Sequence, residues 1–274
     1  MKTNQIQKAV FFILFFAINV LFSQEINNNL HGYYEAKSDA SMYSSFEFDG
    51  NGKVSIIGME LRDYFTKGDS LIIYPDKSIF KFKIQKNKLI GVSDWVEKQT
   101  WIKKDTIVPN NRKDDAKAKN TALLMNEYYK ITGDKSSFDF LGGDEKATIK
   151  KDKINQLCNQ GLSRACLDYF GMLVIEDQGL MNLLNSKKST KPENPTIVSL
   201  AIKIIAQGET EGYAVLGSYY YMIGNKQKAM QLWKIGEQKG DSKSSMALFN
   251  VGLEAELNKI EPEKKIKKST TKRK

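Results

Sequence analysis

The chain has 274 residues, of which 41% are hydrophobic and 27% are charged, and its formal net charge is +10 at pH 7. This length leaves room for two ordinary domains, and the apolar content is sufficient for a core, so disorder throughout the chain is not expected. Half of the charge excess lies in residues 261–274, which carry seven basic and two acidic side chains. A basic tail without a basic folded domain makes nucleic acid an unlikely partner.

Residues 1–23 have the pattern of a cleavable export signal. Lys2 and Lys8 lie before or at the start of an apolar run that ends at Phe22, and Ser23 provides a small residue at the cleavage point. The run is shorter than the roughly 20 residues that a membrane-spanning helix needs, and an uncleaved anchor is the alternative. The pattern therefore predicts a periplasmic or secreted protein.

Residues 30–103 are predicted to form an antiparallel β-barrel or sandwich. Phe80 and Phe82 share one face of an alternating segment, which is the period of a strand with one buried side. The sequence Asp49-Gly50-Asn51-Gly52 predicts a tight turn, because glycine and asparagine tolerate positive φ. Such turn signals recur along the region, as is typical of small all-β domains.

The same region resembles lipocalin-like domains of secreted bacterial proteins. The resemblance rests on Gly32-Tyr33-Tyr34, Phe46-Glu47-Phe48, Gly68-Asp69-Ser70-Leu71 and Trp101. It implies that the barrel could hold a small, lipid-like molecule. The many phenylalanines in short strands instead predict an interior filled by side chains.

Helical patterns follow the β-region. Residues 104–120 are charged and turn-rich, which indicates a linker, and a helical domain is predicted over residues 121–258. Its first helix is expected at 121–132, whereas residues 133–150 show no decisive pattern. Residues 259–274 are predicted to be a disordered basic tail, with contact to an anionic surface as the alternative. Four further helices are expected at 197–206, 211–223, 227–237 and 242–257.

A unit of fixed spacing recurs three times in the helical region. It consists of a glycine, a small residue four positions later, and an apolar pair at positions eight and nine. The copies are Gly161, Ala165, Tyr169-Phe170; Gly208, Gly212, Leu216-Gly217; and Gly240, Ser244, Leu248-Phe249. This spacing resembles Sel-one-like repeats, which are tetratricopeptide-like helix pairs. The resemblance implies an α-solenoid of helix-pair repeats, and the complete chain is therefore predicted to be an α+β protein.

The two cysteines, Cys158 and Cys166, flank the first of these glycines. The pair is similar to the disulfide that ties two helices together in cysteine-rich secreted members of the Sel-one-like family. Cα separations of about 5–6 Å are attainable across an antiparallel helix turn, and an exported chain favours pairing. Two reduced cysteines are the alternative, and a metal site would lack a nearby histidine.

No catalytic, cofactor or metal pattern is evident. His31 is the only histidine, and no nucleophile lies at a spacing that indicates a triad. Asp134, Asp139 and Asp144 do not follow the ligand order of a calcium loop. We therefore expect no enzyme, although the resemblance leaves a cell-wall or β-lactam-directed hydrolase as a remote alternative.

Three tyrosines are predicted to form a partner-binding surface: Tyr213, Tyr219 and Tyr221. Stacked helix pairs present an extended concave surface, where exposed tyrosines suit peptide recognition. Tyr220 is assigned to the core, and packing between helices is the alternative role for the other three. The leading hypothesis is an exported interaction protein with a protein or peptide partner in the cell envelope, and a small ligand in the barrel is the second.

Overall fold

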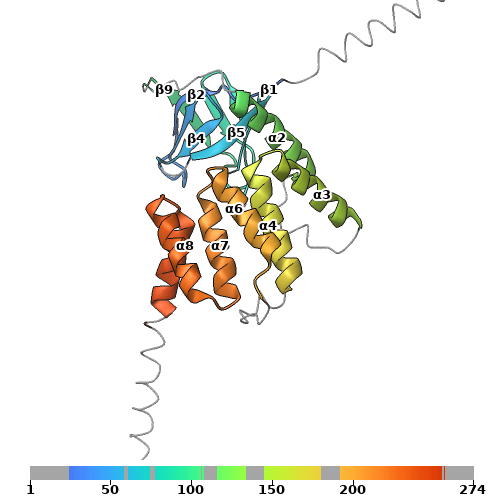
Figure 1. The fold of residues 1–274 in the computed structure, drawn as a ribbon. Coiled ribbons are helices and arrows are strands. Elements are labelled where there is room, and N and C mark those ends of the chain that lie inside the picture. Colours follow the sequence, from blue (N-terminus) through green and yellow to red (C-terminus); the bar gives the residue numbers. More distant parts are fainter. Residues whose placement is uncertain are drawn as a thin grey trace, which may run out of the picture. The chain divides into compact units, whose positions relative to one another are not determined.

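A computed structural model describes residues 25–58, 61–74, 78–105, 107, 116–133, 145–179, 192–254 and 256. They divide into two compact units, Met1–Ser137 and Phe138–Lys274 (Figure 1). The α+β class is as predicted, with an antiparallel barrel first and helices after it. Within the described part of the chain, no helix combines the length and hydropathy that crossing a membrane requires. The predicted export signal and the basic tail lie outside the described residues.

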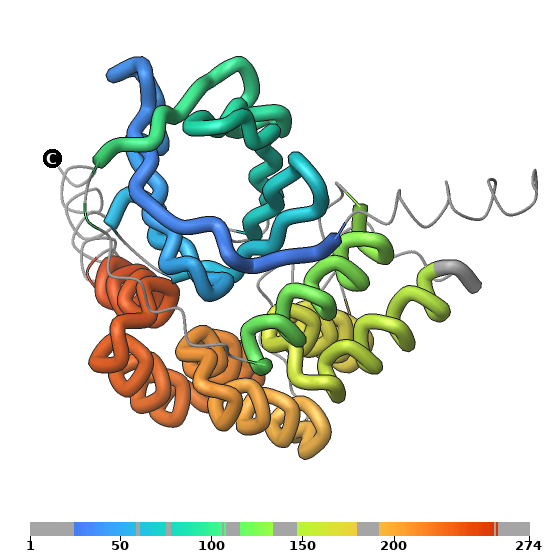
Figure 2. The backbone as a smooth tube through the Cα atoms, turned by 90° about the horizontal axis from the view of Figure 1, so that it is seen from above, coloured from blue at the N-terminus to red at the C-terminus, as the bar shows by residue number. Residues whose placement is uncertain are grey.

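The first unit contains a closed barrel, seen end-on in Figure 2. The ring runs β5-β4-β3-β2-β9-β8-β7-β6, and β6 pairs again with β5. All strand pairs are antiparallel, and β2 closes the ring on β9 with Ala36 opposite Trp101. A short strand, β1, pairs with the last two residues of β5, Thr66 and Lys67, beyond the part of β5 that pairs with β4. The strands are β1 (Ile26–Asn27), β2 (His31–Ala36), β3 (Ser45–Asp49), β4 (Lys53–Ile56), β5 (Leu61–Lys67), β6 (Ser70–Ile73), β7 (Phe80–Gln85), β8 (Lys88–Gly91) and β9 (Thr100–Lys104).

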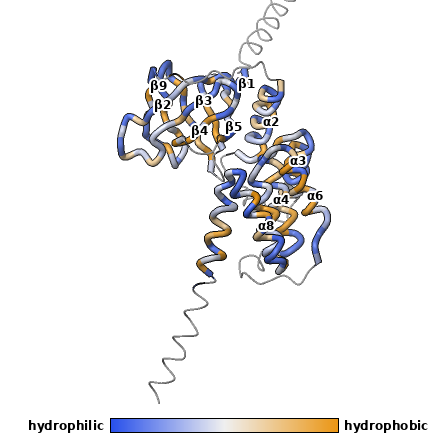
Figure 3. Tube along the Cα trace, turned by 60° about the vertical axis from the view of Figure 1, so that its left-hand side comes forward, coloured by the Kyte–Doolittle hydropathy of each residue, from blue (hydrophilic) through white to orange (hydrophobic). Residues whose placement is uncertain are grey.

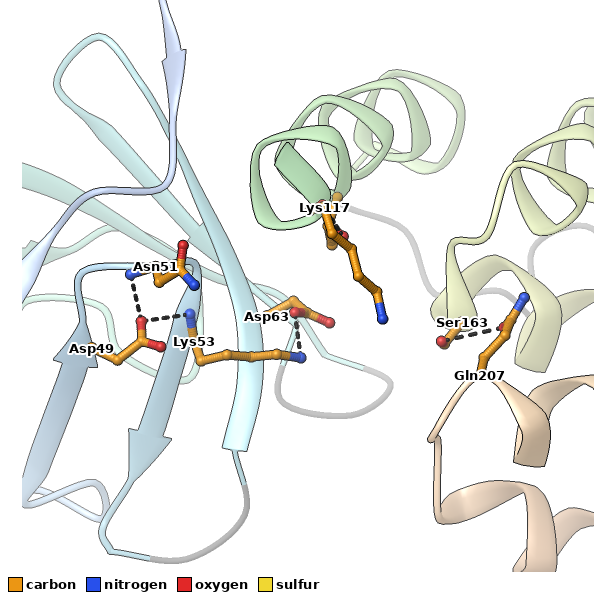
Figure 4. A network of polar contacts seen from close by, with 8 residues as sticks. Asp49, Asn51, Lys53, Asp63, Lys117, Ser163 and Gln207 are labelled. Atoms are coloured by element: carbon orange, nitrogen blue, oxygen red, sulfur yellow. Dashed lines mark hydrogen bonds and ion pairs between the residues drawn. The ribbon is translucent and has the colours of Figure 1, made fainter. Parts of the chain in front are cut away.

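Alternation along each strand decides which side chains enter the barrel. Phe46 and Phe48 of β3 and Phe80 and Phe82 of β7 are all buried, as the period of two predicts. The predicted turn after β3 is also confirmed, because Gly50 and Gly52 both have positive φ. The carboxylate of Asp49 accepts hydrogen bonds from the backbone N–H groups of the two residues at 51 and 53, which fixes this turn (Figure 4).

Helix α2 (Ala116–Thr132) belongs to the barrel unit, which corrects two predictions. It begins inside the segment predicted as a linker, because the alternating alanines and lysines at its start are good helix formers. It also packs on the barrel instead of opening the helical domain. Tyr128 and Tyr129 contact Tyr74 and Phe65, with ring centroids 5.3 and 6.3 Å apart.

The second unit consists of helices that pack successively along the chain. They are α3 (Glu145–Asn159), α4 (Ser163–Gln178), α6 (Pro195–Ala206), α7 (Glu211–Met222), α8 (Lys226–Gln238) and a last helix at residues 242–254. Glycines with positive φ, namely Gly161, Gly208 and Gly240, separate the members of each pair. The small residues four positions later are buried, as a close helix contact requires. Most of the predicted helices are found close to their expected limits, and α3 occupies part of the segment left open.

Candidate interaction surfaces

Aromatic side chains fill the middle of the barrel. Phe46 and Phe82 come from strands on opposite sides of the ring, yet their ring centroids are 5.2 Å apart. Trp101 of β9 lies 5.3 Å from each of them, and its indole Nε1 donates to the Tyr43 carbonyl oxygen at 2.7 Å. This cross-section is a packed core, so it gives no support to a ligand in the barrel.

One end of the barrel is closed by the segment that precedes β2. The Tyr64 hydroxyl points from β5 towards this segment and donates to the carbonyl oxygens of Asn28 and Leu30, at 2.7 and 2.6 Å. Leu30 packs against the core. Burial, together with the charge of Asp49, raises the pKa of Tyr64 far above its ordinary value, so the phenol stays protonated and serves as a structural donor.

The opposite end is closed by the connection between β8 and β9. Val96 from this connection is completely buried in the barrel core. A Cβ at Gly91 would overlap the Val96 carbonyl group, so this approach requires glycine at the end of β8. Gly91 N–H also donates to the Gln99 carbonyl oxygen at 2.9 Å. The described residues therefore place packed side chains in the middle of the barrel and a chain segment across each of its ends.

Cys158 and Cys166 form a disulfide between the last turn of α3 and the first turn of α4. Their Cα atoms are 4.5 Å apart, within the range for a disulfide across a helix turn. Both cysteines and Ala165 are completely buried. This confirms the predicted pairing and is compatible with an oxidising environment.

Polar contacts join this hairpin to the next helix pair. The Ser163 hydroxyl, at the start of α4, donates to the side-chain oxygen of Gln207 at 3.4 Å (Figure 4). Lys203 donates to the side chain of Asn159 at 2.8 Å. Both contacts lie beside the turns at Gly161 and Gly208. The polar side chains at this end of the two helix pairs therefore bind each other within the chain.

The assignment of Tyr219 to a partner-binding surface is wrong. Its side chain is fully buried, and its hydroxyl accepts a hydrogen bond from the backbone N–H of Asn194 at 2.7 Å. Burial raises the pKa of Tyr219 above its usual value. The physical reason is that α7 has helices on two sides, α6 and α8, and therefore buries more than one face. Tyr220 is buried, as predicted.

Tyr213 and Tyr221 are half-buried and have partners within the chain. The Tyr221 hydroxyl donates to Glu254 at 2.6 Å, and the Lys226 ammonium lies 5.1 Å from the centre of its ring. Tyr213 packs beside Gly236, with the Lys239 ammonium 5.9 Å from its ring centroid. These contacts are of the alternative kind, packing between neighbouring helices, and a partner-binding role of Tyr213 and Tyr221 stays a prediction.

The contact between α7 and α8 shows how a helix is received in this unit. Trp233 of α8 donates from Nε1 to the Ala214 carbonyl oxygen at 3.2 Å, and its ring lies 5.6 Å from that of Tyr221. A Cβ at Gly217 would overlap the indole, so the absent side chain is what admits Trp233. The receiving positions of α7 are therefore Ala214, Gly217 and Tyr221, which are six, nine and thirteen residues after Gly208.

The last helix leaves the corresponding positions uncovered. Counting six, nine and thirteen residues from Gly240 gives Met246, Phe249 and Leu253. These side chains are 61%, 66% and 49% exposed. Figure 3 shows hydrophobic segments on this helix just before the grey C-terminal trace. We name these three residues the terminal stripe.

Sequence reasoning missed the terminal stripe, although the signal was present. Phe249 was assigned to the apolar pair of the third unit, without a statement of which neighbour covers that pair. In the structure it is exposed, because the described chain provides no helix after the last one to cover that face. Apolar residues also occur six and thirteen positions after Gly240. Together with Phe249 they indicate an apolar face on which a further helix could pack.

The other candidate residues do not assemble into a site. His31 is half-buried at the start of β2, where its carbonyl oxygen accepts from the Lys103 ammonium at 2.7 Å. The three aspartates at 134, 139 and 144 lie outside the described residues. Among the residues that the structure describes, no group of three or more histidine, cysteine or acidic side chains could hold a metal ion.

Comparison of the chain with family models, with curated proteins and with solved structures found no match. The resemblances to Sel-one-like repeats and to lipocalin-like domains therefore rest on the residues quoted above.

Proposed function

We propose that this chain is an exported interaction protein, without enzymatic activity, whose helical unit binds a protein partner in the cell envelope. The terminal stripe carries this proposal: its three apolar side chains occupy the positions through which α7 receives α8. An amphipathic helix that covered them would remove apolar surface from water, which favours association. In this proposal the helix pairs are repeats of one kind, and a helix of another molecule packs on the terminal stripe as α8 packs on α7.

Two features support export. The disulfide is compatible with an oxidising compartment, and residues 1–23 have the pattern of a cleavable signal. Alkylation of the native protein without a reductant should leave both cysteines unmodified in mass spectrometry, and the mature N-terminus should lie near Gln24. Alkylated cysteines in native material would contradict export. The basic tail is proposed to contact an anionic surface, which its removal would test by loss of envelope association.

A site-specific cross-link tests the proposed surface. A photoreactive p-benzoylphenylalanine in place of Phe249 is expected to form adducts with protein in envelope preparations. The matched control carries the same group in place of Ile202, which is 55% exposed on α6 but lies outside the stripe. Equal adduct yields at both positions, or none at Phe249, would refute binding through this face.

The alternative of a lipid-like ligand in the barrel is not favoured by any observation, since Phe46 and Phe82 meet across its middle. The hydrolase alternative likewise gains no supporting contact among the described residues.

A further inference from the structure

Resting on the proposed function, we propose that the partner that covers the terminal stripe is a second copy of this chain. In this arrangement the helices at residues 242–254 of two copies pack antiparallel about a two-fold axis. The apolar side chains that each copy leaves exposed are then covered by the same side chains of the other copy. Four observations carry this inference.

The stripe is self-complementary under such an axis. When the axis passes between Phe249 and Asn250, Met246 of one copy lies at the level of Leu253 of the other. The two Phe249 side chains then meet near the axis, where aromatic rings can pack against each other. A symmetric contact requires this kind of match, because the same surface must serve both partners.

The charges along the helix run in one direction. Lys243 lies in the first turn, where its ammonium also pairs with Glu211 of α7. Glu254, which accepts a hydrogen bond from Tyr221, and Glu256 lie at the other end. An antiparallel pair brings the basic end of each copy near the acidic end of the other, and it places Lys243 at the level of Glu256. A parallel pair would bring like charges together, so the charges favour the antiparallel arrangement.

The flank of the stripe permits close approach. Gly252 is exposed on the last helix, and a Cβ built on it would meet nothing within 4 Å. On a helical projection it lies beside the stripe, on the same flank as Ser245. Small residues at such positions leave room for the side chains of a neighbouring helix, as Gly217 leaves room for Trp233.

The chain's own C-terminal sequence is a poor alternative cover. Residues 257–274 contain Pro262, eight basic side chains and few apolar ones, so they offer no apolar stripe comparable to Ala229 and Trp233 of α8. Only three large side chains per copy are buried in the proposed contact. The interface is therefore small, and we expect half of the chains to be paired at a concentration on the order of tens of micromolar.

Cysteine substitutions test both the pairing and its direction in the purified chain. Under mild oxidation, Phe249→Cys is expected to form a disulfide-linked dimer. Met246→Cys alone is expected to cross-link at least tenfold less, because two copies of residue 246 lie about 10 Å apart along an antiparallel pair. A mixture of Met246→Cys and Leu253→Cys chains should cross-link between the two variants. Ile202→Cys, on the exposed surface of α6, is the matched control for random collisions.

Sedimentation equilibrium provides a second readout without new cysteines. The unmodified chain should shift from monomer to dimer with concentration, and Phe249→Asp should stay monomeric over the same range. Circular dichroism of that variant shows whether its helices are retained. Cross-linking of Phe249→Cys no stronger than Ile202→Cys, or an unmodified chain that is monomeric throughout, would overturn the second-copy inference. The variant with p-benzoylphenylalanine at position 249 could nevertheless cross-link to another envelope protein. In that case the proposed function would stand and only the second-copy inference would be refuted.

Discussion

The barrel and the helical unit solve the problem of exposed edges in opposite ways. The barrel closes on itself through β2 and β9, so each of its eight strands has a neighbour on both sides. The helical unit is a linear series whose last helix contacts α7 through Glu254 and α8 through Ser244, and leaves an apolar stripe exposed. In a closed barrel every strand is paired and the apolar side chains lie inside. In an open series the last helix keeps an apolar face on which a further helix can pack. The difference locates the candidate function at the end of the series.

The largest loss of stability is expected from a substitution at the centre of the barrel. Trp101→Ala is expected to destabilise the barrel by about 3–5 kcal/mol, because it opens a cavity between Phe46 and Phe82 and leaves the Tyr43 carbonyl without its indole donor. Urea unfolding with separate probes for each unit measures this change. The helical transition should stay in place. Trp95→Ala, at an exposed position, is the control and should change little.

Reduction of the disulfide is expected to destabilise the helical unit and to leave the barrel unchanged. Breaking the bond between Cys158 and Cys166 should lower the stability of this unit by about 2–3 kcal/mol, since the short closed loop no longer restrains the unfolded chain. Urea midpoints with and without a reductant measure the loss. A shift of the barrel transition instead would show that the two units are not independent.

A pair of glycine substitutions sharpens the contrast between covered and open helix faces. Gly217→Ala should cost about 1–3 kcal/mol, because the added methyl group overlaps Trp233. Gly252→Ala meets open space and should stabilise its helix by roughly 0.5–1 kcal/mol. Thermal or urea unfolding at low protein concentration measures both. Equal losses at the two positions would mean that the last helix is covered within its own chain.

High pH provides the mildest test. Burial raises the pKa of Tyr64 above its usual value near 10, so the folded barrel retains a proton that the unfolded chain releases. The contribution is complete below about pH 10 and is lost as the pH rises further, with a slope of about 1.4 kcal/mol per pH unit. Urea midpoints of the barrel between pH 9 and 11 should therefore fall less steeply in Tyr64→Phe. An unchanged slope would assign the alkaline loss to other groups.

Sequence patterns predicted the parts of the fold that follow a simple period. The alternation at Phe80 and Phe82 defined a strand with one face in the core, and the glycine turn between Cys158 and Cys166 defined a stapled hairpin. Helix α2 was assigned to the wrong unit because its sequence specifies a helix but not the surface on which that helix packs. Its buried tyrosines meet barrel residues that are distant in the chain.

The candidate site was less predictable for a related reason. In the run Tyr219-Tyr220-Tyr221, consecutive side chains differ in direction by about 100°, so the exposed one depends on how many neighbours the helix has. Helix α7 has neighbours on two sides and buries Tyr219, whereas the last helix exposes Phe249. The apolar pattern of a helix indicates its contact face, and only the position of the helix in the series shows whether that face is covered.

The closure of the barrel also determines when each part of the chain can fold. Strand β2 meets its second neighbour only in β9, so the ring stays incomplete until the sequence up to Lys104 has emerged during synthesis. Such long-range pairing is slow, and until then the first strand of the ring keeps an unsatisfied edge that other chains could pair with. The helices have no such delay, because each one packs on a neighbour that emerged just before it. Strand β2 is therefore made early but completes its pairing late. The chain is most exposed to aggregation in the period before β9 is available.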